Sequence, residues 1–413
     1  MATRDIDASS LGTAAKRVHA ALIRDHVVTA VYVVILCASF VLETRGHRSL
    51  LYFLALPVFL LYLHANQPRW LWNARIVQIA AVYIAYFFLS AAWSNGLGWL
   101  AMADLLRVGL LVFLFFAVTV LLAVNEDAFE SRLFRWFCLV GGASLILVFL
   151  IQLPALDKDH WRLAGFGRAA QPVIGSTLFG FIFLVAGLAL LPQASGKGER
   201  VLWLVIMALC AAFILMASSR GPLLALAAAL CSAFALAHRR LAIAVVGLLG
   251  AAILVGLSVD FRPVSELFAR GSSGHIALWQ QALQAIAERP WFGHGSLVEI
   301  SFEGKHGLSR SPHNLLLANH LYGGVPATLL LGALFAAGAA GALRVAREGK
   351  PIYLVLLVFG FVAALFDTRT LVQNLGREWI TIWLPLALLA GHMIRAQRTH
   401  SPAPGEKTAG PTP

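Results

Sequence analysis

The chain consists largely of long apolar segments that alternate with short polar connections. A helix that crosses a bilayer needs about 20 mostly apolar residues, and somewhat fewer where its ends are anchored. Only 13% of the 413 residues are charged and 59% are hydrophobic, whereas about a quarter of a soluble domain is charged. We therefore predict an all-α integral membrane protein with about twelve transmembrane helices, at residues 27–42, 49–64, 74–92, 105–124, 133–152, 173–191, 201–217, 222–238, 241–257, 313–336, 352–366 and 379–395.

This pattern divides the chain into five regions. Residues 1–26 are polar and carry four Lys and Arg side chains, and no small-residue cleavage site follows a short apolar run there, so we expect no cleavable signal peptide. The regions that follow are nine helices (27–257), a long outer loop (258–312), three helices (313–395) and a tail (396–413). The end of the tail is rich in Pro and Gly, and we expect the tail to be disordered.

Basic residues predict the orientation of the helices, because Lys and Arg are enriched in short cytoplasmic loops. If both termini are cytoplasmic and the helices alternate in direction, 18 of the 32 Lys and Arg residues lie on the cytoplasmic side. The opposite, periplasmic loops nevertheless carry many basic residues. Positive charge at those positions opposes the topology signal, so we expect part of it to have a function.

One of these basic residues, Arg220, occurs in a Ser-Arg-Gly-Pro turn between two apolar segments. Gly221 and Pro222 favour a sharp turn and the start of the next helix. An ionisable side chain at such a depth is costly and marks a candidate functional site. An arginine can also extend to the interface and simply anchor a helix, but we favour a functional role for Arg220.

The long outer loop contains a predicted amphipathic helix. Ile276, Trp279, Leu283 and Ile286 recur at helical spacing, and Pro290 ends the pattern. We expect this apolar stripe to pack on the membrane body or to lie at its surface. Long loops with their own helix are usually functional, and this one supplies basic candidates at Arg270, His275, Lys305 and Arg310.

His313 follows this loop directly, where the chain becomes apolar again. Ser311 is a plausible N-cap and Pro312 suits the first helical position, which would place His313 and Asn314 in the first turn of a membrane helix. The partial positive charge of a helix N-terminus disfavours imidazolium and attracts anions such as phosphate. A neutral imidazole can accept a proton, as a general base must. The sequence thus predicts a base beside an anion site.

Three segments resemble the O-antigen ligase and polymerase superfamily. They are "SSRGPLLAL", "GHIALWQQALQAIAERPWFGHGS" and "SPHNLLLANHLYGGVPA", which resemble the Ser-Arg-Gly turn, the outer-loop helix and the His-Asn segment of that family. The resemblance covers about a quarter of the chain, from residue 218 to residue 324; the remainder matches only in hydropathy and helix number.

The resemblance implies a membrane-embedded glycosyltransferase of the GT-C type in the bacterial inner membrane. The ligase branch transfers O-antigen from undecaprenyl pyrophosphate to a sugar hydroxyl of lipid A-core, on the periplasmic side, in lipopolysaccharide biosynthesis. Membrane lipid is a further partner, and no nucleic acid is expected. His313 matches the essential histidine of the family, Arg220 the arginine of the turn and Arg270 the arginine of the long loop. The chain departs from the family at His275, where many members have an arginine four residues before Trp279. Either Arg270 or His275 could fill the second phosphate-binding position.

The proposed chemistry requires stabilisation of a pyrophosphate leaving group. A metal ion or positioned Arg and Lys side chains can provide it, and the guanidinium fork suits phosphate. Asp-x-Asp pairs occur at residues 5–7 and 157–159, but the sequence has no His/Cys cluster with metal-ligand spacing. Because arginines are the simpler means of stabilisation, we expect neither a metal nor another cofactor. Outer acids such as Asp367 and Glu378 leave a metal possible. We expect His313 to act as the base in an inverting displacement, and further substrate contacts from His275, Asn314, Lys305, Arg310, Arg162 and Arg168.

Two alternative functions remain open at this level. An O-antigen polymerase or a protein O-oligosaccharyltransferase would use the same donor with a different acceptor, and the motifs do not separate these enzymes. A transporter of lipid-linked glycans would have a similar helix number and basic cavities. We favour an enzyme, because the candidate charges gather on the outer side while the inner half of the helices is apolar.

Overall fold

The structure is a computed structural model that describes residues 24–94, 98–155, 162–236, 274–304 and 307–400, together with Gly247 and Gly250. The predicted span at 241–257, most of the predicted tail, and the candidates Arg270 and Lys305 lie outside the residues that can be described.

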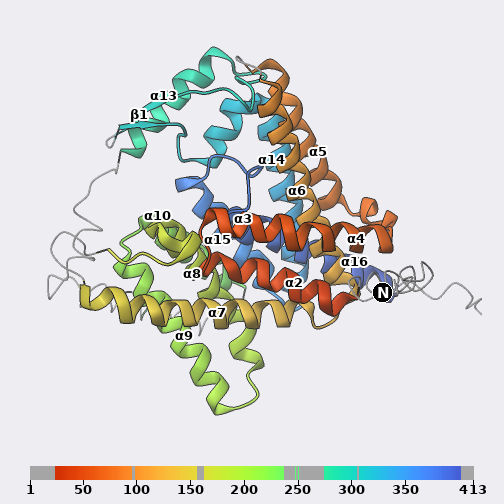
Figure 1. The fold of residues 1–413 in the computed structure, drawn as a ribbon, viewed down its shortest axis with the longest axis vertical. Coiled ribbons are helices and arrows are strands. Elements are labelled where there is room, and N and C mark those ends of the chain that lie inside the picture. Colours follow the sequence, from red (N-terminus) through yellow and green to blue (C-terminus); the bar gives the residue numbers. More distant parts are fainter. Residues whose placement is uncertain are drawn as a thin grey trace, which may run out of the picture.

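The described residues form an almost entirely helical protein (Figure 1). The helices are α2 (Asp25–Cys37), α3 (Thr44–Leu50), α4 (Leu56–Asn66), α5 (Arg75–Leu89), α6 (Trp99–Asn125), α7 (Phe129–Gln152), α8 (Pro172–Val185), α9 (Lys197–Met216), α10 (Arg220–Ala235), α13 (His275–Glu288), α14 (Leu315–Arg347), α15 (Ile352–Asp367) and α16 (Leu384–His400). Two short strands, β1 (Phe302–Gly304) and β2 (Gly307–Ser309), pair as an antiparallel hairpin.

Apolar helices occupy eleven of the twelve predicted membrane segments. Within the described part of the chain, eight helices are long and apolar enough to cross a membrane, and three shorter apolar helices occur at Asp25–Phe40, Arg220–Ala235 and Ile352–Asp367. The all-α membrane architecture is therefore confirmed. The predicted number of twelve spans is not established, because one predicted segment is not described and three helices are shorter than a full span.

The core of the protein is formed by α6, α8 and the α16 segment. About four fifths of the most apolar stretch of each is buried, compared with 28% for Thr44–Asn66, which lies at the periphery. A π-helical turn, Trp379–Trp383, precedes α16 and packs indole rings against the phenylalanines of α6. Trp379 and Trp383 are both fully buried there. Such large aromatic contacts fix α16 against the centre of the bundle.

Helix α14 is interrupted at Gly324, where φ is +63°. A side chain at this position would clash with the backbone of Trp291 and Phe292, so glycine is required both for the left-handed conformation and for the close approach. The backbone of the Trp291–Gly295 turn bonds to the interrupted helix, with His294 N donating to Leu321 O (2.8 Å) and Val325 N donating to Trp291 O (3.0 Å). The interruption thus anchors the outer loop on the membrane body.

Helix α13 confirms the predicted amphipathic helix, but only half of the predicted stripe packs against the protein. Leu278 and Ala282 are the buried residues, whereas Ile276 and Leu283 of the predicted stripe are each 54% exposed. Trp279 and Ile286 of the stripe are partly buried and pack against the core, and α13 as a whole contacts α14. Figure 1 shows α13 and β1 together at the upper edge of the molecule, above α10 and α15.

Candidate active site

His313 lies immediately before α14, not in its first turn. Its φ of +52° is left-handed, which excludes the residue from a helix. Asn314 is the N-cap, because its side-chain oxygen accepts a hydrogen bond from Leu317 N at 3.1 Å. The prediction that Ser311 caps the helix and Pro312 opens it is therefore wrong. Asn caps a helix as well as Ser does, and Ser311 Oγ instead accepts from His313 N at 3.1 Å.

The imidazole of His313 is held by a carboxylate at the end of α15. His313 Nδ1 lies 2.7 Å from Asp367 Oδ1. The other carboxylate oxygen, Oδ2, accepts from Arg377 Nη1 at 2.7 Å, and Arg377 Nη2 also donates to the Asp367 carbonyl. Glu378 accepts from Arg377 Nε at 3.1 Å. Arg377 is buried; burial alone would lower its pKa, but the Asp367 and Glu378 carboxylates raise it above the ordinary value. The guanidinium is thus a fixed charge that orients the carboxylate.

This arrangement leaves one imidazole nitrogen available for chemistry. When neutral His313 donates from Nδ1 to Asp367, Nε2 carries the lone pair. Ser309 Oγ lies 3.2 Å from Nε2, and its own proton is also within reach of the Ser311 carbonyl at 2.8 Å. The His313 side chain is 38% exposed. The geometry therefore provides an oriented proton acceptor that is accessible from outside the protein.

α13 places a second histidine and a tryptophan next to His313. The rings of His275 and His313 are 6.1 Å apart, and Trp279 Nε1 donates to the Pro312 carbonyl at 3.0 Å. Burial lowers the pKa of His275, and the positive charge of a protonated His313 and of Arg220 lowers it further. The Asp367 carboxylate opposes this shift only in part, so the pKa of His275 stays below its ordinary value of 6.5. An arginine, which the family resemblance predicts here, would instead stay charged.

A cavity of about 490 Å³ opens beside these residues. Its lining combines two arginines, one histidine and one carboxylate with the Ser-Arg-Gly-Pro turn: Arg162, Val173, Ser218, Ser219, Arg220, Gly221, Pro222, Leu224, His275, Ile276, Trp279, Phe366 and Asp367. An added Cβ at Gly221 would lie 2.8 Å from Phe366 Cβ, so glycine lets α10 pack directly on α15. Arg162 is held at the rim by hydrogen bonds to the Ala217 carbonyl (3.0 Å) and Ser219 Oγ (3.4 Å).

The structure thus brings Arg220, Arg162 and His275 to one cavity, and His313 lies beside it. Other candidates lie elsewhere. Arg168 donates to Thr44 Oγ1 at 2.8 Å and to the Leu375 carbonyl at 2.6 Å, so it braces the chain segment before Arg377 and does not line the cavity. The Arg310 side chain is exposed, and its carbonyl accepts from Tyr322.

Sequence reasoning missed the role of Asp367 and Arg377. The sequence pattern identifies Asp367 only as an outer acid that could bind a metal, and it does not single out Arg377. The available signal was an acid that directly ends an apolar helix and is followed by a basic residue in the next loop. Among the described residues, no group of three His, Cys, Asp or Glu side chains could hold a metal ion.

Comparison with known proteins reveals similarity over the site and beyond it. The family model described as O-antigen ligase matches residues 205–332, a range that contains Arg220, α13 and His313. An O-antigen ligase from Pseudomonas aeruginosa is 29% identical over 374 residues, which cover 88% of this chain and 89% of that protein. The family match contains Arg220, α13 and His313, and the similarity to one relative extends over most of the length, so the chain is similar to O-antigen ligases both at the candidate site and beyond it.

Proposed function

We propose that the protein transfers O-antigen glycan from undecaprenyl pyrophosphate to a sugar hydroxyl of lipid A-core, as a multi-pass glycosyltransferase of the inner membrane. The observation that carries this proposal is the juxtaposition of His313, oriented by Asp367, with a cavity lined by Arg220 and Arg162. A base next to guanidinium groups suits a reaction in which a hydroxyl attacks and a pyrophosphate leaves. The name of the Pseudomonas aeruginosa relative supports the same reaction class.

In the proposed reaction, His313 Nε2 takes the proton of the acceptor hydroxyl. The oxygen forms a bond to the anomeric carbon, and the bond from that carbon to the pyrophosphate oxygen breaks. Undecaprenyl pyrophosphate leaves with the electron pair, and one displacement inverts the anomeric configuration. The Asp367 carboxylate stabilises the imidazolium that forms at His313, as a buried carboxylate does in a Ser-His-Asp triad.

The arginines of the cavity hold the donor pyrophosphate in this proposal. A guanidinium stays charged and binds two phosphate oxygens at once, so it stabilises negative charge as it develops. Arg220 is the principal phosphate ligand and Arg162 a secondary one. Arg270, Lys305 and Arg310 of the long loop are further candidates on the same side of the membrane. The site faces the periplasm and both termini are cytoplasmic, in agreement with the basic-residue pattern.

Transfer with purified components tests the function directly. The full-length protein is incubated with undecaprenyl-pyrophosphate glycan and with one of three acceptors: lipid A-core, a lipid-linked repeat unit or a pilin-type protein. We expect transfer to lipid A-core. Transfer to the repeat unit alone would identify a polymerase, and transfer to protein alone an oligosaccharyltransferase.

The same assay in EDTA tests the role of the arginines. We expect an unchanged rate, because guanidinium groups rather than a metal stabilise the leaving group. Loss of activity that Mg²⁺ or Mn²⁺ restores would replace the arginine account with a metal-dependent one.

A further inference from the structure

A second cavity of about 480 Å³ lies among the ends of α5, α14 and α16. It is lined by the first residues of α5 and by the last turns of α14 and α16. His313 precedes the opposite end of α14, and the other end of α5 continues into Trp93, whose indole bonds to the outer-loop residue Phe292. This cleft, lined by Asn73, Ala74, Arg75, Ile76, Ala337, Ala340, Gly341, Arg344, Ala390, Met393, Ile394 and Gln397, is therefore at the far end of the helices from the candidate active site.

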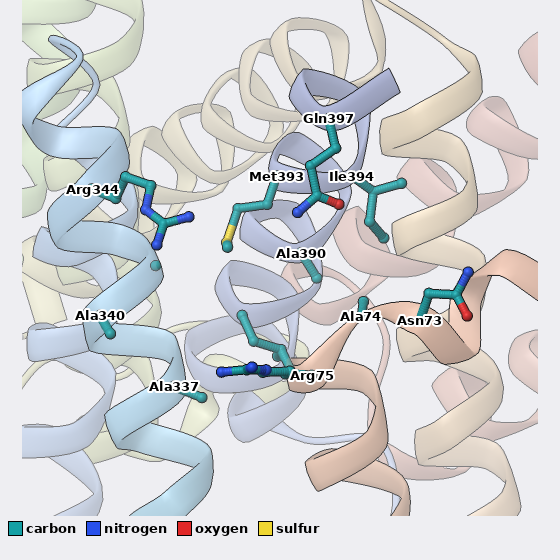
Figure 2. Close-up of a pocket in the computed structure, with 12 residues that line it drawn as sticks. Asn73, Ala74, Arg75, Ala337, Ala340, Arg344, Ala390, Met393, Ile394 and Gln397 are labelled. Atoms are coloured by element: carbon teal, nitrogen blue, oxygen red, sulfur yellow. The ribbon is translucent and has the colours of Figure 1, made fainter. Parts of the chain in front are cut away.

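Two arginines enter the cleft from opposite walls. Figure 2 shows Arg75 extending from α5 and Arg344 extending from α14 toward the space in front of α16, with Gln397 above them. No acidic residue is among those that line the cleft. Within the described part of the chain, neither guanidinium forms an ion pair, although Glu348 is one helical turn from Arg344. Two like charges that converge without a protein counterion form a site for an anion.

The α14 and α16 walls of the cleft are mainly apolar, and several of their side chains are small. Ala337, Ala340 and Gly341 form the α14 wall, and Ala390 and Ile394 form the α16 wall. An added Cβ at Gly341 would lie 2.7 Å from Met393 Sδ, so the absence of a side chain there keeps the α14 and α16 walls close. A cleft that combines two guanidinium groups with alkyl surface along its helices matches an amphiphile rather than a free ion.

We propose that this cleft binds an anionic phospholipid of the adjacent leaflet. The phosphate of the head group lies between Arg75 and Arg344, and its acyl chains follow the apolar surface of α14 and α16. Basic pockets between membrane helices recognise anionic head groups in this way. A guanidinium pair binds the phosphate of an anionic lipid in preference to that of a zwitterionic lipid, whose own cationic group it repels. The proposal does not depend on the reaction at His313.

Lipid binding to the purified full-length protein tests the proposal. Phosphatidylglycerol is titrated into delipidated protein in detergent, and bound lipid is counted by native mass spectrometry, with phosphatidylcholine as the zwitterionic comparison. In Arg75→Gln/Arg344→Gln we expect phosphatidylglycerol affinity to fall on the order of 30-fold, since each basic side chain near a membrane surface contributes roughly a factor of five. Phosphatidylcholine binding should not change.

The matched control removes two arginines from the same segments of the chain. Arg69→Gln/Arg347→Gln alters exposed residues beside α5 and in α14 that do not line the cleft, and it should bind phosphatidylglycerol as the unaltered protein does. A second variant, Ala340→Leu, fills the cleft without changing charge and should weaken the same binding. Equal losses in the control and in the cleft variant would overturn the proposal.

A competition arm separates a lipid site from a simple phosphate site. Millimolar inorganic phosphate should not displace phosphatidylglycerol, because the apolar walls contribute only to binding of a lipid. Displacement by phosphate alone would overturn the lipid assignment.

Discussion

Two cavities of nearly equal volume, about 490 and about 480 Å³, lie toward opposite ends of the helices, and each is lined by two arginines. They differ in what accompanies the arginines. The cavity beside His313, called the outer cavity below, has His275 and Asp367 in its lining. The cleft between α5, α14 and α16 has only amides, alkyl groups and the Met393 thioether besides its arginines. Guanidinium groups can bind phosphate in both places. Only the outer cavity has a group that can accept a proton during a reaction.

The comparison also separates two ways of holding a charged side chain. The residues around His313 form a continuous chain of contacts from Ser309 through His313 and Asp367 to Arg377. Such a network holds each side chain in one orientation. Catalysis benefits from this, because the reacting groups must be held in a defined geometry. Arg75 and Arg344 are exposed side chains without such contacts among the described residues, which suits a site that is completed by its ligand.

Removal of the base should give the largest effect. His313→Ala should lower transfer on the order of 10² to 10⁴-fold, the usual contribution of general base catalysis, while donor binding stays largely intact because the arginines hold the phosphates. Single-turnover transfer and donor binding are measured on the same preparation. As the comparison, Arg75→Gln/Arg344→Gln should leave the chemical step within a few-fold of the unaltered protein.

Two outcomes would contradict this assignment. If His313→Ala transfers glycan within a few-fold of the rate of the unaltered protein, His313 is not the general base. A variant that instead loses donor affinity would make His313 a phosphate ligand, and the outer cavity would then resemble the cleft in having a binding role alone.

Asp367→Asn should give the next largest effect, on the order of 100-fold. In the proposed reaction Asp367 acts through His313 as a positioning residue, and an amide can neither stabilise imidazolium nor enforce the same tautomer. The pH profile of transfer should change in this variant, and Asp367→Glu should restore part of the rate. Donor affinity should not change. If Asp367→Asn lowered only the yield of folded protein and left the pH profile of the remaining activity intact, the carboxylate would be merely structural.

Arg220→Lys should lower transfer on the order of tenfold to 100-fold, because lysine keeps the charge but loses the bidentate fork. The protein should still insert and purify, since the charge at the start of α10 remains. The loss should appear in donor affinity as well as in rate, unlike the loss in His313→Ala. Arg344→Lys in the cleft is the matched substitution and should not alter transfer. Normal transfer by Arg220→Lys would reduce Arg220 to an anchor of the helix.

The sequence predicted the helices well, because continuous apolar length is a local property that each segment carries by itself. Eleven of the predicted segments coincide with helices to within a few residues, apart from the longer α14. The errors arose where tertiary contacts decide. The start of α14 depends on which of Ser311 and Asn314 reaches a free N–H, and the buried face of α13 depends on its contact with α14.

The candidate site was predictable in its basic residues and not in its acidic one. Arg220 and His313 occur in short motifs that can be read locally. Asp367 is 54 residues from His313, and Arg377 is a further 10 residues away, so only the fold can pair them. No periodicity in the sequence specifies such a contact. The cleft could not be predicted from the sequence either, because its two arginines are 269 residues apart along the chain. In the sequence, each is simply one of the basic residues in the predicted cytoplasmic loops.

The smallest expected effect concerns His275 and the identity of the second phosphate ligand. Burial lowers the pKa of His275 from its ordinary value of 6.5, and His313 and Arg220 add to the shift. The imidazole is therefore mostly neutral at pH 8 and at pH 7, because its pKa lies below the ordinary value of 6.5. His275→Gln should consequently leave donor affinity within about twofold across this interval, as expected where no charge is lost.

The alternative predicts a different pH dependence. If His275 replaced the family arginine by becoming protonated, donor affinity of the unaltered protein would rise as the pH falls from 8 to 6.5, and His275→Gln would abolish that rise. The sign for stability follows from the same shift. The unfolded chain binds a proton at His275 more readily than the folded protein does, so folding stability falls as the pH drops below about 6.5. Thermal unfolding between pH 8 and 5 should show a smaller acid-side loss in His275→Gln. If donor affinity proves independent of His275, the fixed charge must come from an arginine, and Arg162 already lies at the rim of the cavity to provide it.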